Sequence, residues 1–199
     1  MISDAEANPN STRTDSGVRL TRTTHGTHQV ELWGVMPVGW LGNFTRGAAR
    51  MRLDIVRGVA RRGSQRHWSA SFEMRGAIDV DFEQVDFLSL AREASSSPPA
   101  IPLVLQRYQL TRSSERIGAL ELRIGAPDRV GFLSSLLEHL AGFVLFPEEI
   151  SIDTFEDEAR DMLLLSSVGG QPPPPELEEA LRVSLRAWTR DRASLFPRA

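Results

Sequence analysis

The sequence predicts an α+β protein in which one arrangement, β-α-β-β-α-β, occurs twice in tandem. Segments in which polar and apolar residues alternate are typical of strands with one buried face, and they flank segments with apolar residues three or four apart, as in amphipathic helices. The same order of segments recurs in the second half of the chain. With 199 residues and a hydrophobic fraction of 41%, the chain can form two small cores. We therefore expect antiparallel sheets with helices on one face.

The first repeat begins with a strand that ends at Pro37 and Gly39, which interrupt the alternation. A Gly63-Ser64 turn joins two further alternating segments into a hairpin. The segment Ser95–Ala100 ends the second helix. The expected elements are a strand at 29–35, a helix at 40–51, strands at 52–62 and 67–74, a helix from Asp79 or Asp81 to Ala91, and a strand at 103–110.

The second repeat has the clearest helical pattern, with apolar residues four apart from Phe132 onward. Four prolines at 172–175 form a rigid connection to a last helix that has acidic residues in its first turn, as the helix dipole favours. The expected elements are a strand at 116–124, a turn at 126–131, a helix at 132–143, strands at 149–155 and 159–168, a helix at 176–190 and a short strand at 193–196.

These patterns divide the chain into three parts. Residues 1–27 have few large apolar side chains, so we expect a disordered N-terminal tail. Residues 28–112 and 113–199 are expected to form the first and second domains. His25 and His28 form a possible metal-binding pair, but no third ligand lies nearby in the sequence, so we expect no metal site.

The composition argues against catalysis. The chain has no cysteine, and all 23 basic residues are arginine, which removes thiolate nucleophiles, Schiff-base lysines and the lysine of phosphate-binding loops. The sequence also lacks glycine-rich phosphate loops and hydrolase or metalloprotease motifs. His139 is expected on a helix face. We therefore expect a protein that is not an enzyme and needs no cofactor.

Charge and hydropathy also limit the partners. The net charge of −3, with acids and arginines interspersed, argues against nucleic-acid binding. The longest apolar stretch, around 130–146, is interrupted by polar residues, so we expect no membrane span. The first residues lack the basic and apolar regions of a secretory signal, which favours the cytoplasm.

The most informative motif is Asp128-Arg129-Val130-Gly131-Phe132, between an expected strand and an expected helix. A glycine there lets backbone amides approach a ligand closely, and a helix N-terminus attracts a carboxylate. Asp128 could cap the helix or receive a ligand's ammonium group. The alternative is that Asp128 is only a cap and Gly131 only a tight turn.

This motif and its continuation through Ile150–Thr154 and Asp161–Leu165 resemble the ACT domain family, in particular the C-terminal ACT domains of bacterial uridylyltransferases. The resemblance implies two tandem ferredoxin-like units, a ligand site at Asp128, Arg129, Val130, Gly131 and Phe132, and a regulatory protein. The implied partners are an amino acid or another small metabolite, and a second copy of the chain or another protein. The alternative is a structural adaptor that uses Trp33, Trp40, Trp68 and Trp188 as anchors.

The first repeat keeps the order of elements but not the motif. If Gly39 is aligned with Gly131, Met36 and Pro37 stand opposite Asp128 and Arg129. The acidic and basic residues are both missing, so we expect the ligand at the second turn.

Overall fold

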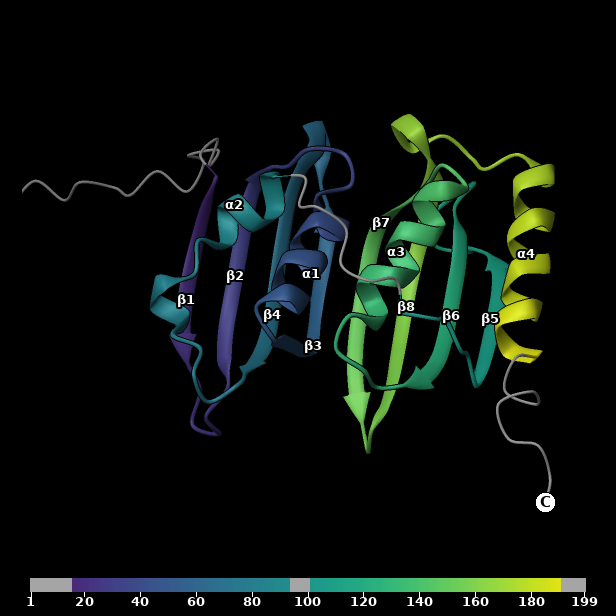
Figure 1. The fold of residues 1–199 in the computed structure, drawn as a ribbon. Coiled ribbons are helices and arrows are strands. Elements are labelled where there is room, and N and C mark those ends of the chain that lie inside the picture. Colours follow the sequence, from purple (N-terminus) through teal and green to yellow (C-terminus); the bar gives the residue numbers. More distant parts are fainter. Residues whose placement is uncertain (1–15, 94–100, 191–199) are drawn as a thin grey trace, which may run out of the picture.

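The computed structural model describes residues 16–93 and 101–190. Within these ranges it contains eight strands and four α-helices (Figure 1). The strands are β1 Gly17–Arg22, β2 His28–Val35, β3 Leu53–Arg62, β4 His67–Gly76, β5 Arg107–Arg112, β6 Leu120–Pro127, β7 Leu145–Phe155 and β8 Glu158–Ser167. The helices are α1 Trp40–Arg50, α2 Phe87–Arg92, α3 Phe132–Gly142 and α4 Pro175–Arg190.

The strands form one antiparallel sheet in the order β1-β2-β4-β3-β7-β8-β6-β5. The first half of this order is mirrored by the second half, and β3 and β7 join the halves in the middle. Each half of the chain has the element order β-β-α-β-β-α. The α+β class and the antiparallel sheet expected from the sequence are confirmed.

The edge strands differ from the sequence prediction. Residues 17–22, expected within a disordered tail, form β1 and pair with β2 through the register Leu20↔Val30. Leu20 packs against the core, and β1 supplies partners for the backbone groups on the outer side of β2. The tail prediction is therefore wrong for this segment.

The strand expected at 103–110 also has a different place. It begins only at Arg107, and it pairs with β6 of the second half rather than closing the first. Each half therefore has the order β-β-α-β-β-α instead of the expected β-α-β-β-α-β. Its edge strand comes before its other strands in the chain, and not after its second helix. The expected strand at 193–196 and the end of the second helix at Ser95–Ala100 lie outside the described residues.

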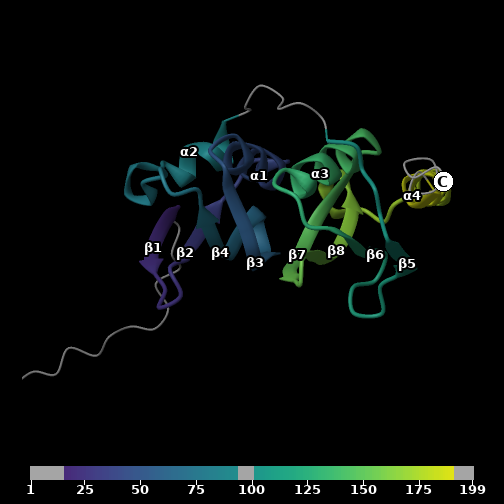
Figure 2. The same cartoon turned by 60° about the horizontal axis from the view of Figure 1, so that its bottom comes forward.

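Helices α1, α2 and α3 lie on one face of the sheet, while α4 lies beside the edge strand β5 (Figure 2). Leu181 and Leu185 of α4 are fully buried, and Leu177 and Trp188 are half-buried. The backbone amide of Leu105 donates to the carbonyl of Trp188 at 3.1 Å, which ties the segment before β5 to α4. The last helix therefore covers one edge of the sheet.

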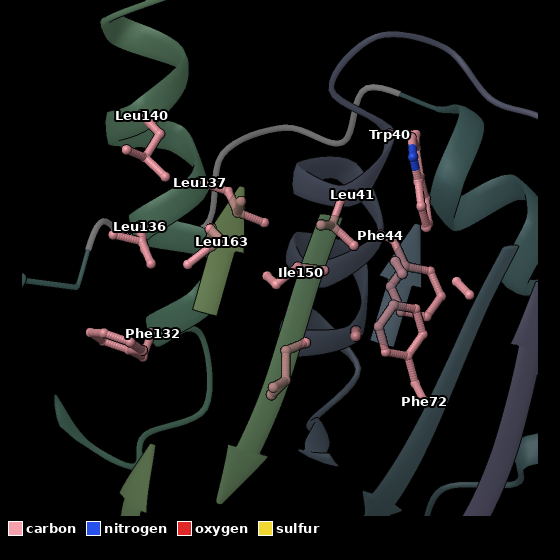
Figure 3. Packing of buried hydrophobic residues seen from close by; sticks show 14 of the residues in the cluster. Trp40, Leu41, Phe44, Phe72, Phe132, Leu136, Leu137, Leu140, Ile150 and Leu163 are labelled. Carbon is pink, nitrogen blue, oxygen red and sulfur yellow. The ribbon is translucent and has the colours of Figure 1, made fainter. Parts of the chain in front are cut away.

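One hydrophobic core extends across both halves (Figure 3). In the first half Phe44 of α1 stacks on Phe72 of β4, with ring centroids 5.1 Å apart. At the junction, Ala60 of β3 pairs with Ile150 of β7, and both are fully buried. The halves therefore share their interior and are not two cores joined by a linker.

The opposite face of the sheet is polar. Arginines and glutamates alternate along it and form exposed ion pairs, such as Arg61–Glu149 at 2.9 Å across the junction and Arg19–Glu31 at 3.1 Å. Such exposed pairs add little stability, but they keep this face hydrated. No helix among the described residues is long and apolar enough to cross a membrane.

Candidate functional site

The junction between β3 and β7 places α1 and α3 next to each other. The turn before each helix meets the C-terminal half of the other helix. Thus Gly39 shares a cavity with Leu137 and Ala141 of α3, and Gly131 shares a second cavity with Thr45 and Ala48 of α1. Two related cavities therefore lie at the two ends of the junction.

The two turns have the same backbone conformation. Gly39 has φ 78° and ψ 6°, and Gly131 has φ 91° and ψ −6°, so both precede their helices in the left-handed region that favours glycine. The two glycines that were aligned in the sequence therefore have the same backbone conformation and the same place before a helix. No side chain caps either helix, so Asp128 does not act as the cap that the sequence allowed.

The residues predicted to bind a ligand at the second turn have different environments. Asp128 is half-buried, and its backbone amide donates to the Asp157 carbonyl at 2.8 Å. Arg129 and Val130 are exposed, and the Arg129 carbonyl accepts from the amide of Phe132 at 2.9 Å. The Phe132 ring belongs to the core. All five residues border the cavity, Gly131 included, but Phe132 is mainly a packing residue.

This second cavity has a volume of only about 40 Å³. A buried water needs roughly 10–15 Å³ by this measure, whereas ligand sites usually have about 300–1,000 Å³. The side chain of Ile101 helps to close it, since its Cδ1 lies 2.9 Å from the position that a Cβ on Gly131 would take. The cavity holds a few waters or one small polar group and not a whole amino acid.

Three carboxyl groups, those of Asp54, Asp128 and Asp161, line this small cavity, and the last two have raised pKa values. Asp161 of β8 is 3% exposed, and its Oδ1 has no hydrogen-bond partner among the described residues. Burial raises the pKa of Asp161 to about 7, and the nearby Asp128 and Asp153 carboxylates add to this effect, while the Asp153 backbone amide opposes it. Burial, with repulsion from Asp54, also raises the pKa of Asp128, and Arg75 acts in the opposite direction.

The cavity at the first turn is much larger, about 270 Å³. Its walls are largely apolar, and both halves of the chain contribute to them. They include Met36 and Val38 of the turn, Trp40, Trp68, and from the second half Leu137, Ala141, Leu145 and Phe146. Trp40 and Trp68 meet edge to face with centroids 5.2 Å apart, and both are nearly fully buried. The volume approaches that of sites that hold small ligands.

Polar groups of both signs border this apolar space. Arg46, Arg62, Arg66, Glu138 and Glu148 line it. The Trp40 Nε1 is buried without a hydrogen-bond partner among the described residues, which leaves a donor next to the cavity. A mainly apolar pocket with a few charged and donor groups is the usual composition of a small-molecule site.

Sequence reasoning assigned the ligand to the second turn because only that turn carries charged residues. The structure supplies charges to the first cavity from elsewhere, with Arg62 at the end of β3 and Glu148 in β7. These residues belong to no short motif. Their convergence depends on the pairing of β3 with β7, which the sequence pattern did not specify.

The histidines considered in the sequence do not form a metal site. His28 stacks on Phe82, with ring centroids 3.9 Å apart, and His139 contacts the carbonyl of Ser135 at 2.8 Å and the edge of Trp188. Residues 16–93 and 101–190 contain no group of three or more acidic, histidine or cysteine side chains arranged to hold a metal ion.

No protein-family model matches the chain. No curated protein matches it either. Among solved structures, an aspartate kinase from Synechocystis is similar to it, with 15% sequence identity and a TM-score of 0.46. The match covers 81% of this chain but only 27% of that kinase chain.

Proposed function

We propose that the protein is a non-catalytic regulatory module of two tandem ACT-like units, which binds a small metabolite such as an amino acid between them and so controls a partner protein. The cavity of about 270 Å³ at the first turn supports this proposal most directly. Two halves with the same element order and equivalent glycine turns, joined through β3 and β7, also fit this reading.

The position of the cavity connects binding to regulation. Residues of both halves form its walls, so a bound molecule contacts both and stabilises the arrangement in which they are packed together. A ligand shifts a conformational equilibrium only by its difference in affinity for the two states. A site shared by two halves provides such a difference, because separating them removes part of the site.

All four tryptophans that the adaptor alternative uses as anchors make contacts within the fold. Trp40 and Trp68 are in the core, and Trp188 packs against His139. Trp33 lies against Gly17 and within 5.9 Å of the Arg19 guanidinium. Trp40 and Trp68 therefore support the adaptor alternative least, because they are buried, while Trp33 and Trp188 are half-buried.

The test is a thermal-shift and calorimetric screen of the standard amino acids against the purified protein. The variant Gly42→Leu places a side chain at the cavity wall, where an added Cβ lies 3.9 Å from Leu137 Cβ. The matched control is Gly142→Leu at the end of α3, because an added Cβ there meets nothing within 4 Å. We expect a stabilising ligand whose effect is lost in Gly42→Leu and kept in Gly142→Leu.

Other outcomes would contradict the proposal. If no amino acid binds, or if binding is equal in both variants, the amino-acid site at the first turn is wrong. A stoichiometric protein partner retained without added metabolite would favour the adaptor. Substrate turnover by the purified protein that persists in Gly42→Leu would contradict a non-catalytic role.

A further inference from the structure

A third cavity, of about 350 Å³ and more polar, adjoins the cavity at the first turn. The two share Arg62, Arg66, Glu148 and Gly169 in their walls. The polar cavity extends between the β3–β4 turn of the first half and the loop before β6 in the second, where Arg116 lies. A single molecule can therefore occupy both spaces and contact both halves.

The polar cavity is strongly cationic. Arg62, Arg66 and Arg116 line it, and among the described residues of its wall Glu148 is the only acidic one, which leaves an excess of two positive charges. Glu148 is 5% exposed and already engaged, since it pairs with Arg62 at 2.5 Å and with Arg116 at 3.4 Å and accepts from Ser166 Oγ at 2.7 Å. The excess charge is not neutralised by the residues that form the wall.

Arg66 differs from Arg62 and Arg116, which both pair with Glu148. It is exposed, and it takes part in no ion pair or side-chain hydrogen bond within the part of the chain that the structure describes. Its backbone has φ 60°, and the preceding Gln65 has φ 52°, so two consecutive non-glycine residues adopt the left-handed conformation. This conformation is unfavourable for ordinary residues, and such strain often accompanies a functional position.

Across the cavity, Gly170 lies beside the part-buried ion pair of Arg62 and Glu148. An added Cβ on Gly170 would lie 3.4 Å from Glu148 Oε1 and 3.8 Å from Arg62 Nη1. Gly169 and Gly170 both have φ 79°. These two glycines leave space for a ligand beside Arg62, which larger residues would fill.

We infer that the joined cavities bind a metabolite with a compact dianionic group, a phosphate monoester or a pair of carboxylates, attached to an apolar body. The dianion lies among Arg62, Arg66 and Arg116, and the apolar body extends toward Val38 and Leu137 in the adjoining cavity. Planar guanidinium groups bind phosphate and carboxylate oxygens through paired hydrogen bonds, and two excess positive charges match a dianion. This inference rests on the proposed function and specifies the charge of its ligand.

Isothermal titration calorimetry at low salt tests the inference with inorganic phosphate, succinate, adenosine 5′-monophosphate and adenosine. Phosphate and succinate separate the two kinds of dianion, and adenosine is the uncharged counterpart of its monophosphate. Arg66→Gln removes the unpaired cation, and Arg22→Gln on the edge strand β1 is a control with the same change in net charge. Thermal unfolding of both variants checks that they fold.

We expect at least one dianion to bind the unaltered protein, with adenosine far weaker. Arg66→Gln should reduce that affinity about ten- to a hundred-fold, as for loss of a hydrogen bond between charged groups, while Arg22→Gln changes it little. Binding should also weaken at high salt. Equal loss in both arginine variants, or no binding of any dianion, overturns the inference.

The amino-acid screen separates this failure from failure of the proposed function. If a neutral amino acid binds and responds to Gly42→Leu but not to Arg66→Gln, the regulatory site stands and the dianion inference is wrong. If a dianion binds but no standard amino acid does, the inference stands and the ligand class in the proposed function is changed.

Discussion

The buried Asp161 should make the protein less stable as the pH rises from about 4 to about 7. Its carboxyl group has a pKa of about 7 in the folded protein, against 3.8 ordinarily, because burial disfavours the charged form. The folded state therefore holds this proton more tightly than the unfolded state. Below about pH 4 both states are protonated and the group has no effect. Between about pH 4 and 7 the unfolded state loses the proton first, so the free energy of unfolding falls.

The size of the effect follows from the shift. Each pKa unit corresponds to about 1.4 kcal/mol, so a shift of about three units corresponds to an upper limit of about 4 kcal/mol above pH 7. At pH 5 the decrease in the free energy of unfolding is smaller, less than about 2 kcal/mol. The raised pKa of Asp128 acts in the same direction.

The perturbation is Asp161→Asn, which keeps the shape of the side chain and removes the charge. We expect the variant to be more stable than the unaltered protein at pH 8, by up to about 4 kcal/mol, and nearly equal at pH 4. Urea unfolding at a series of pH values from 4 to 8 measures the difference. Asp157→Asn, at an exposed turn residue, is the control with the same change in formal charge. A variant that is less stable at pH 8, or whose stability falls with pH as steeply as that of the unaltered protein, would refute the reasoning.

Three glycine substitutions test how closely the backbone is packed. Gly131→Ala should destabilise the protein by about 1–2 kcal/mol, because φ is 91° and the new Cβ would lie 2.9 Å from Ile101 Cδ1. Gly142→Ala, which meets no atom within 4 Å, should stabilise it by up to about 1 kcal/mol, and equal thermal shifts in the two variants would contradict this. Gly58→Ala in β3 should lower the free energy of unfolding by about 1–3 kcal/mol, because the new Cβ would lie 2.8 Å from the Ser71 carbonyl oxygen. Chemical denaturation measures this loss, and an unchanged free energy of unfolding would mean that β3 and β4 separate easily to make room.

The sequence predicted the central elements well because their patterns are local. The helix expected at 132–143 is observed at Phe132–Gly142, and the strands expected at 52–62 and 67–74 are observed at Leu53–Arg62 and His67–Gly76. The edge strands were harder to place. Gly17–Arg22 carries few large apolar residues, and its place depends on a free edge of β2 that only the assembled sheet defines.

The candidate site shows the same limit. The turn at Gly131 can be recognised in the sequence because its motif consists of five adjacent residues, 128–132. The larger cavity is not visible, because Trp40, Arg62, Arg116 and Glu148 meet only after β3 pairs with β7. Apolar periodicity indicates which face of a strand is buried, but not which strand of another repeat it joins.

The two halves have the same element order but different residues at their turns, so the two cavities can differ. In a symmetric dimer of identical units, the two ends of the junction would carry the same residues and the same site. Here each turn has its own sequence. The Gly131 end is small and acidic around Asp161, whereas the Gly39 end is larger and adjoins Arg62, Arg66 and Arg116. A shape-conserving exchange at one end should therefore leave the other unaffected, so Asp161→Asn should change the pH dependence of stability without changing dianion binding at Arg66.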